Sequence, residues 1–164
     1  MAKAAAQTAA APTAIIAIEQ NFALDQRVIV DGLAYSILPF GARAVAWLTR
    51  PAFARNCMVK ILEKTSPGLW ALVTCRKRYI DERLIESLDN IDAMVNLGAG
   101  FDTRAYRLPA LAGVPVWEVD QPRNIALKQA LLRKRLGFIP THVTLVPTDF
   151  DRQDLGATLT SYGY

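Results

Sequence analysis

The chain is poor in the residues that build metal centres and histidine-dependent active sites. Its 164 residues include one histidine, His142, and two widely separated cysteines, Cys57 and Cys75. A structural zinc site needs about four clustered ligands, so we expect no metal site. His142 stands before a predicted strand, and we assign it a structural role rather than a place in a nucleophilic triad. We interpret the cysteines as reduced core thiols of a cytoplasmic protein.

Long hydrophobic runs are also missing. The alanine-rich stretch Met1–Ile18 carries Lys3 and several isoleucines, but polar residues at positions 7, 8 and 13 interrupt it. This pattern favours a frayed or helical tail over a signal peptide. No other run reaches the length of a membrane span, so we expect no membrane partner.

Charge of either sign is modest. Hydrophobic residues make up 52% of the chain and charged residues 21%, which is typical of one globular domain with a sizeable core. The net charge is +4. Aromatic and basic residues do not alternate, so this charge indicates a mildly basic surface and not a nucleic-acid partner.

The most informative stretch runs from Val95 to Leu108. The short apolar segment Ala93–Leu97 predicts a buried parallel strand. Gly98-Ala99-Gly100 then allows a sharp turn, and Asp102 or Thr103 is placed to cap a short helix. A strand, a glycine turn and a helix in this order bring the backbone of an α/β sheet close to a ligand.

The turn departs from the dinucleotide fingerprint, because Thr103 stands where a third glycine is expected. This disfavours a nicotinamide-dependent dehydrogenase. Val116–Asp120 predicts a second strand that ends in an acid, roughly 20 residues after the glycines, where a carboxylate commonly holds ribose hydroxyls. A ribose acid without a pyrophosphate loop fits S-adenosyl-L-methionine.

The region Asn21–Lys64 is predicted to be helical. Its segments are Asp25–Ile37, Arg43–Arg50 and a helix that starts at Pro51. These helices form either a cap over the ligand or a plain packing layer beneath the sheet. Three of its aromatic residues, Tyr35, Trp47 and Phe53, are predicted to be core residues.

A long helix is predicted over Leu69–Leu88, with Ile80, Leu84 and Leu88 as its buried stripe. Further along the chain, Pro122–Leu136 predicts a helix that ends at Gly137. Val143–Val146 predicts a third strand.

Three motifs together are recognisable: RKRYIDERL at 76–84, LGAGFDTRAYRL at 97–108 and EVDQP at 118–122. In this order they resemble the leucine carboxyl methyltransferase-like family, and its bacterial and mycobacterial-type S-adenosylmethionine-dependent methyltransferases in particular. The resemblance runs from about Asp25 to the C-terminus. It implies an α/β fold: the N-terminal part of a Rossmann-like class I methyltransferase, with a helical cap and the first three parallel strands.

The resemblance also implies the cofactor contacts. An arginine on the helix before the first strand holds the ligand carboxylate, and both Arg76 and Arg78 match it. An acid after the third strand meets the adenine amino group beside an apolar residue, which Asp149 and Phe150 match. Without the family, Asp149 serves equally well as a turn or helix cap. The predicted cofactor-binding residues are Arg76, Arg78, Gly98, Ala99, Gly100, Asp120, Gln121, Asp149 and Phe150.

The implied organisation is a tail over 1–20, a helical cap region over 21–68 and a partial S-adenosylmethionine-binding domain over 69–164. The implied activity is methyl transfer to an oxygen of a small-molecule hydroxyl or carboxylate. A sulfonium methyl is already activated, so positioning suffices and no catalytic residue is named.

Family members continue well beyond the length of this chain, so the resemblance implies a truncated or split form. Its first strand would be an exposed sheet edge, which a homodimer or a second chain would cover. The alternative is a non-catalytic S-adenosylmethionine-binding remnant that needs a partner chain.

Overall fold

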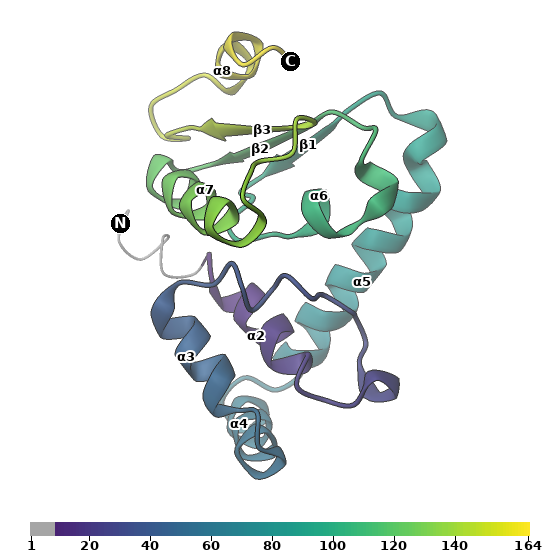
Figure 1. Ribbon diagram of the computed structural model, residues 1–164, viewed down its shortest axis with the longest axis vertical. Helices are drawn as coiled ribbons and strands as arrows, with labels where there is room; N and C mark the ends of the chain where they lie inside the picture. The colour runs from purple at the N-terminus through teal and green to yellow at the C-terminus, as the bar shows by residue number, and fades with distance from the viewer. Residues whose placement is uncertain (1–8) are drawn as a thin grey trace.

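The computed structural model describes residues 9–164. The helical region formed by α2, α3 and α4 lies at one end, a small sheet lies at the other, and the long helix α5 runs between them (Figure 1). The helices are α2 (Ala11–Glu19), α3 (Phe40–Leu48), α4 (Ala52–Thr65), α5 (Leu69–Ser87), α6 (Arg104–Arg107), α7 (Pro122–Leu136) and α8 (Leu155–Ser161). The strands are β1 (Met94–Leu97), β2 (Val116–Asp120) and β3 (Val143–Pro147), and short 3-10 turns cover Leu24–Gln26, Leu88–Asn90 and Pro109–Leu111.

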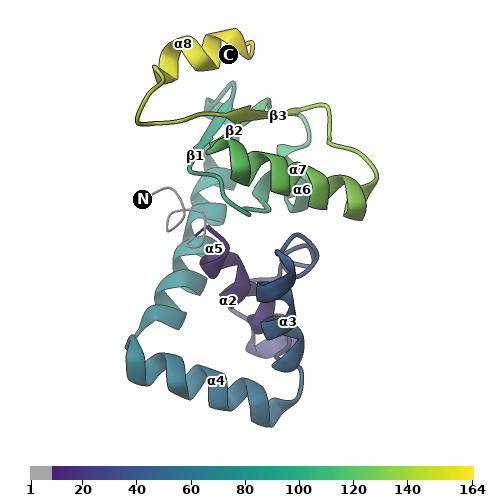
Figure 2. The same ribbon diagram turned by 90° about the vertical axis from the view of Figure 1, so that its left-hand side faces the viewer.

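The sheet is parallel, with the strands in the order β1-β2-β3. Helices α6 and α7 cover one face and α8 lies over the other (Figures 1 and 2). Ala105 of α6 packs on Val116 and Val143, while Leu159 of α8 packs on the opposite face. This confirms the predicted α/β fold class, a Rossmann-like arrangement with a helix after each strand.

The predicted strands and the helix after β2 are confirmed. Pro122 begins α7 as its first helical residue, and Gly137 ends it with a left-handed φ of 83°. The alanine-rich stretch is helical from Ala11, and Ile16 at its centre is fully buried in the core of the helical region. Its first eight residues lie outside the described part of the chain.

The predicted helix over Asp25–Ile37 is wrong, since this segment consists of the end of the 3-10 turn Leu24–Gln26, irregular backbone and further turns. Side chains satisfy its backbone groups instead. Glu19 accepts from the Val28 N–H, and the Asp31 carboxylate accepts from the N–H groups of Leu33 and Ala34. Such side-chain acceptors compete with the helical ladder and hold the segment in a turn against α2 and α3.

The helix predicted over Leu69–Leu88 is confirmed as α5, but its predicted buried face is wrong. Ile80 is 41% exposed, whereas Val73, Lys77 and Asp81 are buried. The buried residues do recur at every fourth position, but they lie on a different face of the helix from the predicted one. That face can be buried because its charged side chains find partners on other segments.

The predicted core positions of both cysteines and two aromatic residues are also wrong. Cys57 and Cys75 are exposed, and so are Trp47 and Phe53. Helix α4 crosses between α3 and α5 (Figure 2). It carries no fully buried residue, which agrees with the exposure of Cys57 and Phe53.

Strand β1 pairs only with β2 within the described residues, as expected for an edge strand, and Leu97 at its end is 55% exposed. Over residues 9–164, no helix combines the length and the apolar character needed to cross a membrane.

Candidate functional site

A cavity of about 550 Å³ opens where β1 and β2 end. In a parallel sheet this edge is where ligands commonly bind. Helices α2 and α5, the glycine turn and the start of α7 surround it. Its lining residues are Ala9, Pro12, Thr13, Val73, Arg76, Lys77, Ile80, Asn96, Gly98, Ala99, Gly100, Phe101, Asp102, Arg104, Asp120, Gln121, Asn124 and Phe150.

The glycine turn is bent sharply against the N-terminal helix. Gly98 and Gly100 have φ values of 66° and 46°, in the left-handed region that favours glycine. A side chain at Gly100 would come within 3.1 Å of the Ala9 carbonyl. The Thr13 hydroxyl donates to the Phe101 carbonyl at 3.0 Å, so α2 closes one side of the cavity.

Asp120 lies at the end of β2, with its carboxylate bound to the turn. Its Oδ2 accepts from the Gly100 N–H at 2.6 Å, and its Oδ1 accepts from the Gln121 N–H at 2.7 Å. The Asn124 amide donates to Oδ1 as well, at 2.7 Å. These donors hold a 6% exposed carboxylate in one orientation at the edge of the cavity.

The two candidate arginines are in different places. Arg76 lines the cavity, whereas Arg78 points its guanidinium to Glu82 on the outer side of α5, with Nε 2.8 Å from Oε1. Glu82 raises the pKa of Arg78. No described residue forms an ion pair with Arg76. Of these two arginines, only Arg76 therefore has a charge available to the cavity.

The two predicted residues downstream of β3, Asp149 and Phe150, also lie in different places. Phe150 lines the cavity, and Asp149 does not. The Asp149 carboxylate accepts from the Asp151 N–H at 3.2 Å, which is the turn role that its position also allowed. The cap of α8 is Asp154, whose side chain accepts from the Ala157 N–H at 2.6 Å.

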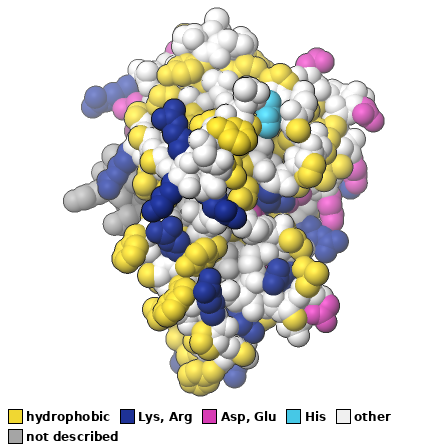
Figure 3. Space-filling view, in the orientation of Figure 1, with side chains coloured by type: hydrophobic (Ala, Val, Ile, Leu, Met, Phe, Trp, Pro, Cys, Tyr) yellow, Lys and Arg dark blue, Asp and Glu magenta, His cyan; other side chains and the backbone are white. Residues whose placement is uncertain are grey.

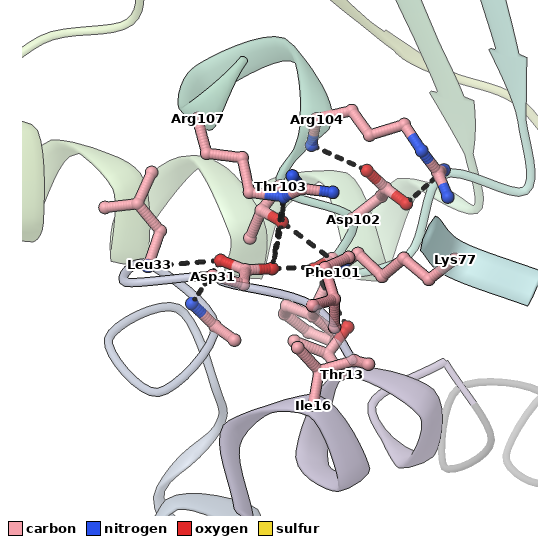
Figure 4. A network of polar contacts seen from close by, with 12 residues as sticks. Thr13, Ile16, Asp31, Leu33, Lys77, Phe101, Asp102, Thr103, Arg104 and Arg107 are labelled. Carbon is pink, nitrogen blue, oxygen red and sulfur yellow. Dashed lines mark hydrogen bonds and ion pairs between the residues drawn. The ribbon is translucent and has the colours of Figure 1, made fainter. Parts of the chain in front are cut away.

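A cluster of buried charges holds the glycine turn to the helical region (Figure 4). Asp31, fully buried, accepts from the Lys77 ammonium at 3.0 Å and from the Thr103 hydroxyl at 2.5 Å. We call this group, with Asp81, Asp102, Arg104 and Arg107, the Asp31 cluster. The Asp31 cluster links three segments that are distant in the sequence: the turn at Asp31, helix α5 and helix α6 with the residues before it.

Helix α6 is anchored by the same cluster. Arg104 lies 2.6 Å from Asp102 and 2.7 Å from Asp81, and Arg107 also pairs with Asp81. Of the two arginines on α6, Arg104 is the one that pairs with Asp102. Burial by itself would raise the pKa of Asp102, but Lys77, Arg104 and Lys128 together lower it below its usual value.

A second cluster lies between the sheet and α7. Glu118 and Lys128, both fully buried, are 2.7 Å apart, and the Tyr106 hydroxyl donates to Glu118 at 2.6 Å. We call these three residues the Glu118 cluster. Burial raises the pKa of Glu118 despite the ammonium beside it, and burial together with the Glu118 charge raises the pKa of Tyr106.

Sequence reasoning missed several cavity residues. Thr13 and Asn124 belong to no motif, and nothing in the motif at 76–84 marks Lys77 as a cavity residue. The one available signal was the four-residue spacing of Val73, Lys77 and Asp81, which places them on one helix face. Within residues 9–164 no group of residues could hold a metal ion. His142 has the predicted structural position, with Nε2 at 3.0 Å from the Ala105 carbonyl.

The molecular surface mixes apolar and basic side chains. On the face seen in Figure 3, Lys and Arg side chains are interspersed with hydrophobic ones. This agrees with a mildly basic surface of the kind expected from the net charge of +4.

Relatives of known sequence match somewhat more than half of the chain. A protein of Mycobacterium avium is 41% identical over 95 residues, which are 57% of this chain and 31% of that protein. A protein of Mycolicibacterium gilvum is 39% identical over 94 residues, 56% of this chain and 37% of that protein. Both are named "Putative S-adenosyl-L-methionine-dependent methyltransferase". The match thus spans about a third of each relative's length.

The family model described as leucine carboxyl methyltransferase matches residues 9–164, from the first residue of the cavity wall to the end of α8 and beyond. This range includes the glycine turn, Asp120 and the whole of α5. The chain therefore belongs to the leucine carboxyl methyltransferase family.

Proposed function

We propose that the cavity binds S-adenosyl-L-methionine and that the chain serves methyl transfer from it. One observation carries the proposal: a single cavity combines an arginine that has no ion-pair partner among residues 9–164, a glycine turn and a buried carboxylate at the end of β2. Its volume of about 550 Å³ lies in the range typical of small-molecule sites. The matching relatives are named for this cofactor, which supports the assignment.

Each part of the ligand has a counterpart among these residues. Arg76 would hold the carboxylate of the methionine moiety through a two-pronged hydrogen bond, as guanidinium groups commonly do. The turn Gly98-Ala99-Gly100 would lie along the ligand, and Asp120 would accept a ribose hydroxyl. Phe150 would pack on the adenine, with Gln121 near the ribose. Asp149 and Arg78 have weaker support, because neither lines the cavity.

The bound cofactor supplies an activated methyl group on a sulfonium. The protein then has to orient the acceptor in line with that methyl and exclude water. We propose an oxygen acceptor on a small molecule, a hydroxyl or a carboxylate, as the family resemblance implies. The apolar residues Ile80 and Phe150 at the cavity would restrict water there.

A second candidate function is cofactor binding without turnover by this chain alone. The observation that favours it is the open edge of β1, where Leu97 is 55% exposed directly before the glycine turn. An edge strand of this kind pairs readily with another strand. We propose that a second copy or a second chain covers this edge in the active form.

Calorimetric titration with S-adenosylhomocysteine tests the proposal. We expect binding by the wild-type chain, a loss of about tenfold or more for Arg76→Ala, and no change for Arg78→Ala. The two variants are a matched pair, since they remove the same group from the same helix. Equal losses for both would contradict the role of Arg76, and no binding by folded wild-type protein would refute the proposed function. Turnover with a panel of acceptors then separates the two candidates.

A further inference from the structure

The Asp120 carboxylate is nearly saturated by protein donors. A carboxylate offers about four lone-pair positions, two on each oxygen. Oδ1 already accepts from the Gln121 N–H and the Asn124 amide, and Oδ2 accepts from the Gly100 N–H. One position remains, on Oδ2. A ribose carries two neighbouring hydroxyls, and Asp120 in this arrangement has room to accept from one of them.

Asn124 is the residue placed to accept from the other hydroxyl. It lies in the first turn of α7, lines the cavity and is 5% exposed. Its amide must donate to Asp120, because a carboxylate is only an acceptor, and this fixes which end of the amide faces Asp120. The amide oxygen is therefore directed away from Asp120, and no donor among residues 9–164 reaches it.

We infer that Asn124 is a second ribose-binding residue of this cavity. Its side-chain oxygen accepts one hydroxyl of the nucleoside while Asp120 Oδ2 accepts the other. The inference rests on the proposed function, because it takes a nucleoside as the ligand. It assigns a contact to a residue that no motif marks, and it makes the pair Asp120 and Asn124 the unit that recognises the two hydroxyls.

This arrangement also gives the two hydroxyls different surroundings. Asp120 is held by three donors and keeps its orientation, so its hydrogen bond to the ligand is charge-assisted. The Asn124 oxygen is neutral, so its hydrogen bond is weaker. Loss of one hydroxyl should therefore cost more affinity than loss of the other.

The test compares S-adenosylhomocysteine with its 2′-deoxy and 3′-deoxy analogues by calorimetric titration of wild-type protein and Asn124→Leu. Leucine has the same number of side-chain heavy atoms and the same branching as asparagine, and no polar atom. We expect Asn124→Leu to bind S-adenosylhomocysteine about tenfold more weakly, the effect of one ordinary hydrogen bond. We also expect one deoxy analogue to bind wild-type and variant protein equally, because the variant has already lost the contact to that hydroxyl.

One variant serves as the control. Arg123→Leu changes the preceding residue on the exposed side of α7 and should leave every affinity unchanged. Gln121→Leu tests the competing assignment, because Gln121 carries the other amide at the cavity and lies near the ribose in the proposed pose. Its overall affinity can fall, but its dependence on both hydroxyls should stay intact. If Asn124→Leu does not fold, as judged by circular dichroism, Asn124→Ala takes its place in the same comparison.

The outcomes are distinct. If Asn124→Leu weakens the parent ligand and both analogues by the same factor, Asn124 acts only by orienting Asp120 and the inference is wrong. It is also wrong if the affinity for the parent ligand is unchanged, or if Gln121→Leu abolishes the hydroxyl dependence. If folded wild-type protein binds none of the three nucleosides, the proposed function fails as well.

Discussion

The Asp31 cluster and the Glu118 cluster both bury charged side chains, but they differ in how completely those charges are paired. The Asp31 cluster contains three carboxylates and three cations, and Asp31 alone accepts hydrogen bonds from a lysine, a hydroxyl and two backbone N–H groups. The Glu118 cluster contains one carboxylate and one ammonium, and its Glu118 Oε1 has no partner among the described residues.

The pKa values follow from this difference. Both carboxylates lose hydration on burial, but the cations around Asp102 outweigh that loss and lower its pKa. Lys128 and Tyr106 do not outweigh it at Glu118, whose pKa is raised. Burial therefore does not determine whether a charge stabilises the fold; the number of cations and donors within reach does.

The largest expected effect comes from breaking the Asp31 cluster at its centre. Asp31→Ala leaves Lys77 and Arg107 without this partner and removes the acceptor of the turn, so we expect a loss of about 3–5 kcal/mol in the free energy of unfolding. Urea denaturation measures it. Asp31→Asn keeps a side-chain oxygen that can accept from the backbone N–H groups of the turn, so it should lose less unfolding free energy than Asp31→Ala. A loss below about 1 kcal/mol for Asp31→Ala would show that the cluster adds no stability.

Removing the cation of the Glu118 cluster should cost somewhat less. Lys128→Met leaves Glu118 buried beside Tyr106 alone, and neutralisation of the carboxyl limits the penalty to about 3 kcal/mol. The double variant Lys128→Met with Glu118→Gln should recover part of this loss in the same urea experiment. If the two single losses simply add in the double variant, Glu118 and Lys128 are not coupled.

The hydroxyl of Tyr106 is expected to contribute a smaller amount. Tyr106→Phe removes one donor to Glu118 and leaves the ring in place, which should cost about 1.5 kcal/mol of unfolding free energy. The variant should also raise the pKa of Glu118 further, since the hydrogen bond from Tyr106 lowers it. Thermal unfolding with a matched Tyr79→Phe control, whose ring is 60% exposed, separates the buried hydroxyl from a general effect.

Acidification should change the unfolding free energy in opposite directions through the two clusters. The pKa of Glu118 is raised in the folded state, so the folded protein binds this proton more tightly than the unfolded chain does. Protonation of Glu118 therefore increases the stability of the fold as the pH falls toward the unfolded-state pKa of about 4.5. Asp102 has a lowered pKa, so its contribution is present above the unfolded value of about 3.8 and is lost as the pH falls through the folded value.

Unfolding free energies between pH 3 and pH 8 (on the order of 1 kcal/mol per pH unit at most for one group) test this assignment. Glu118→Gln should remove the gain on mild acidification, and Asp102→Asn should flatten the loss at lower pH. A wild-type profile that Glu118→Gln leaves unchanged would show that Glu118 is ionised normally in the fold.

The smallest effect on stability is expected for an ion pair on the surface, although its N–O distance is similar to those of the buried pairs. Arg78 and Glu82 are 2.8 Å apart, but their side chains are 57% and 48% exposed. Water and salt screen such a pair, so Arg78→Ala should leave the midpoint of urea denaturation unchanged. The neighbouring substitution Lys77→Met should lower it clearly. A comparable loss for both would mean that burial is not what separates these pairs.

The sequence predicted the elements whose signals are local. The strand before Gly98, the strand that ends at Asp120 and the helix from Pro122 to Gly137 all follow from apolar runs, glycines and prolines within a few residues of one another. The glycine turn and Asp120 were predicted as a site for the same reason, since each is read from its own strand end.

The errors concern residues whose partners are distant in the sequence. Asp25–Ile37 has the spacing of a helix, but Glu19 and Asp31 satisfy its backbone in another form. Lys77 and Asp81 look like solvent-facing residues until their partners, Asp31 and Arg104, are brought beside them. A charge is placed inside a protein only by its counter-charges, and a hydrophobic pattern does not contain that information.

The sequence by itself determined the family, the parallel α/β fold and the glycine turn with the acid at the end of the second strand, because these depend on backbone geometry and on periodicity over short stretches. The tertiary structure decided that Arg76 and not Arg78 faces the cavity, that Arg104 pairs with Asp102, and that Asn124 stands beside Asp120. These choices depend on the rotation of each helix about its axis, and packing between distant segments sets that rotation.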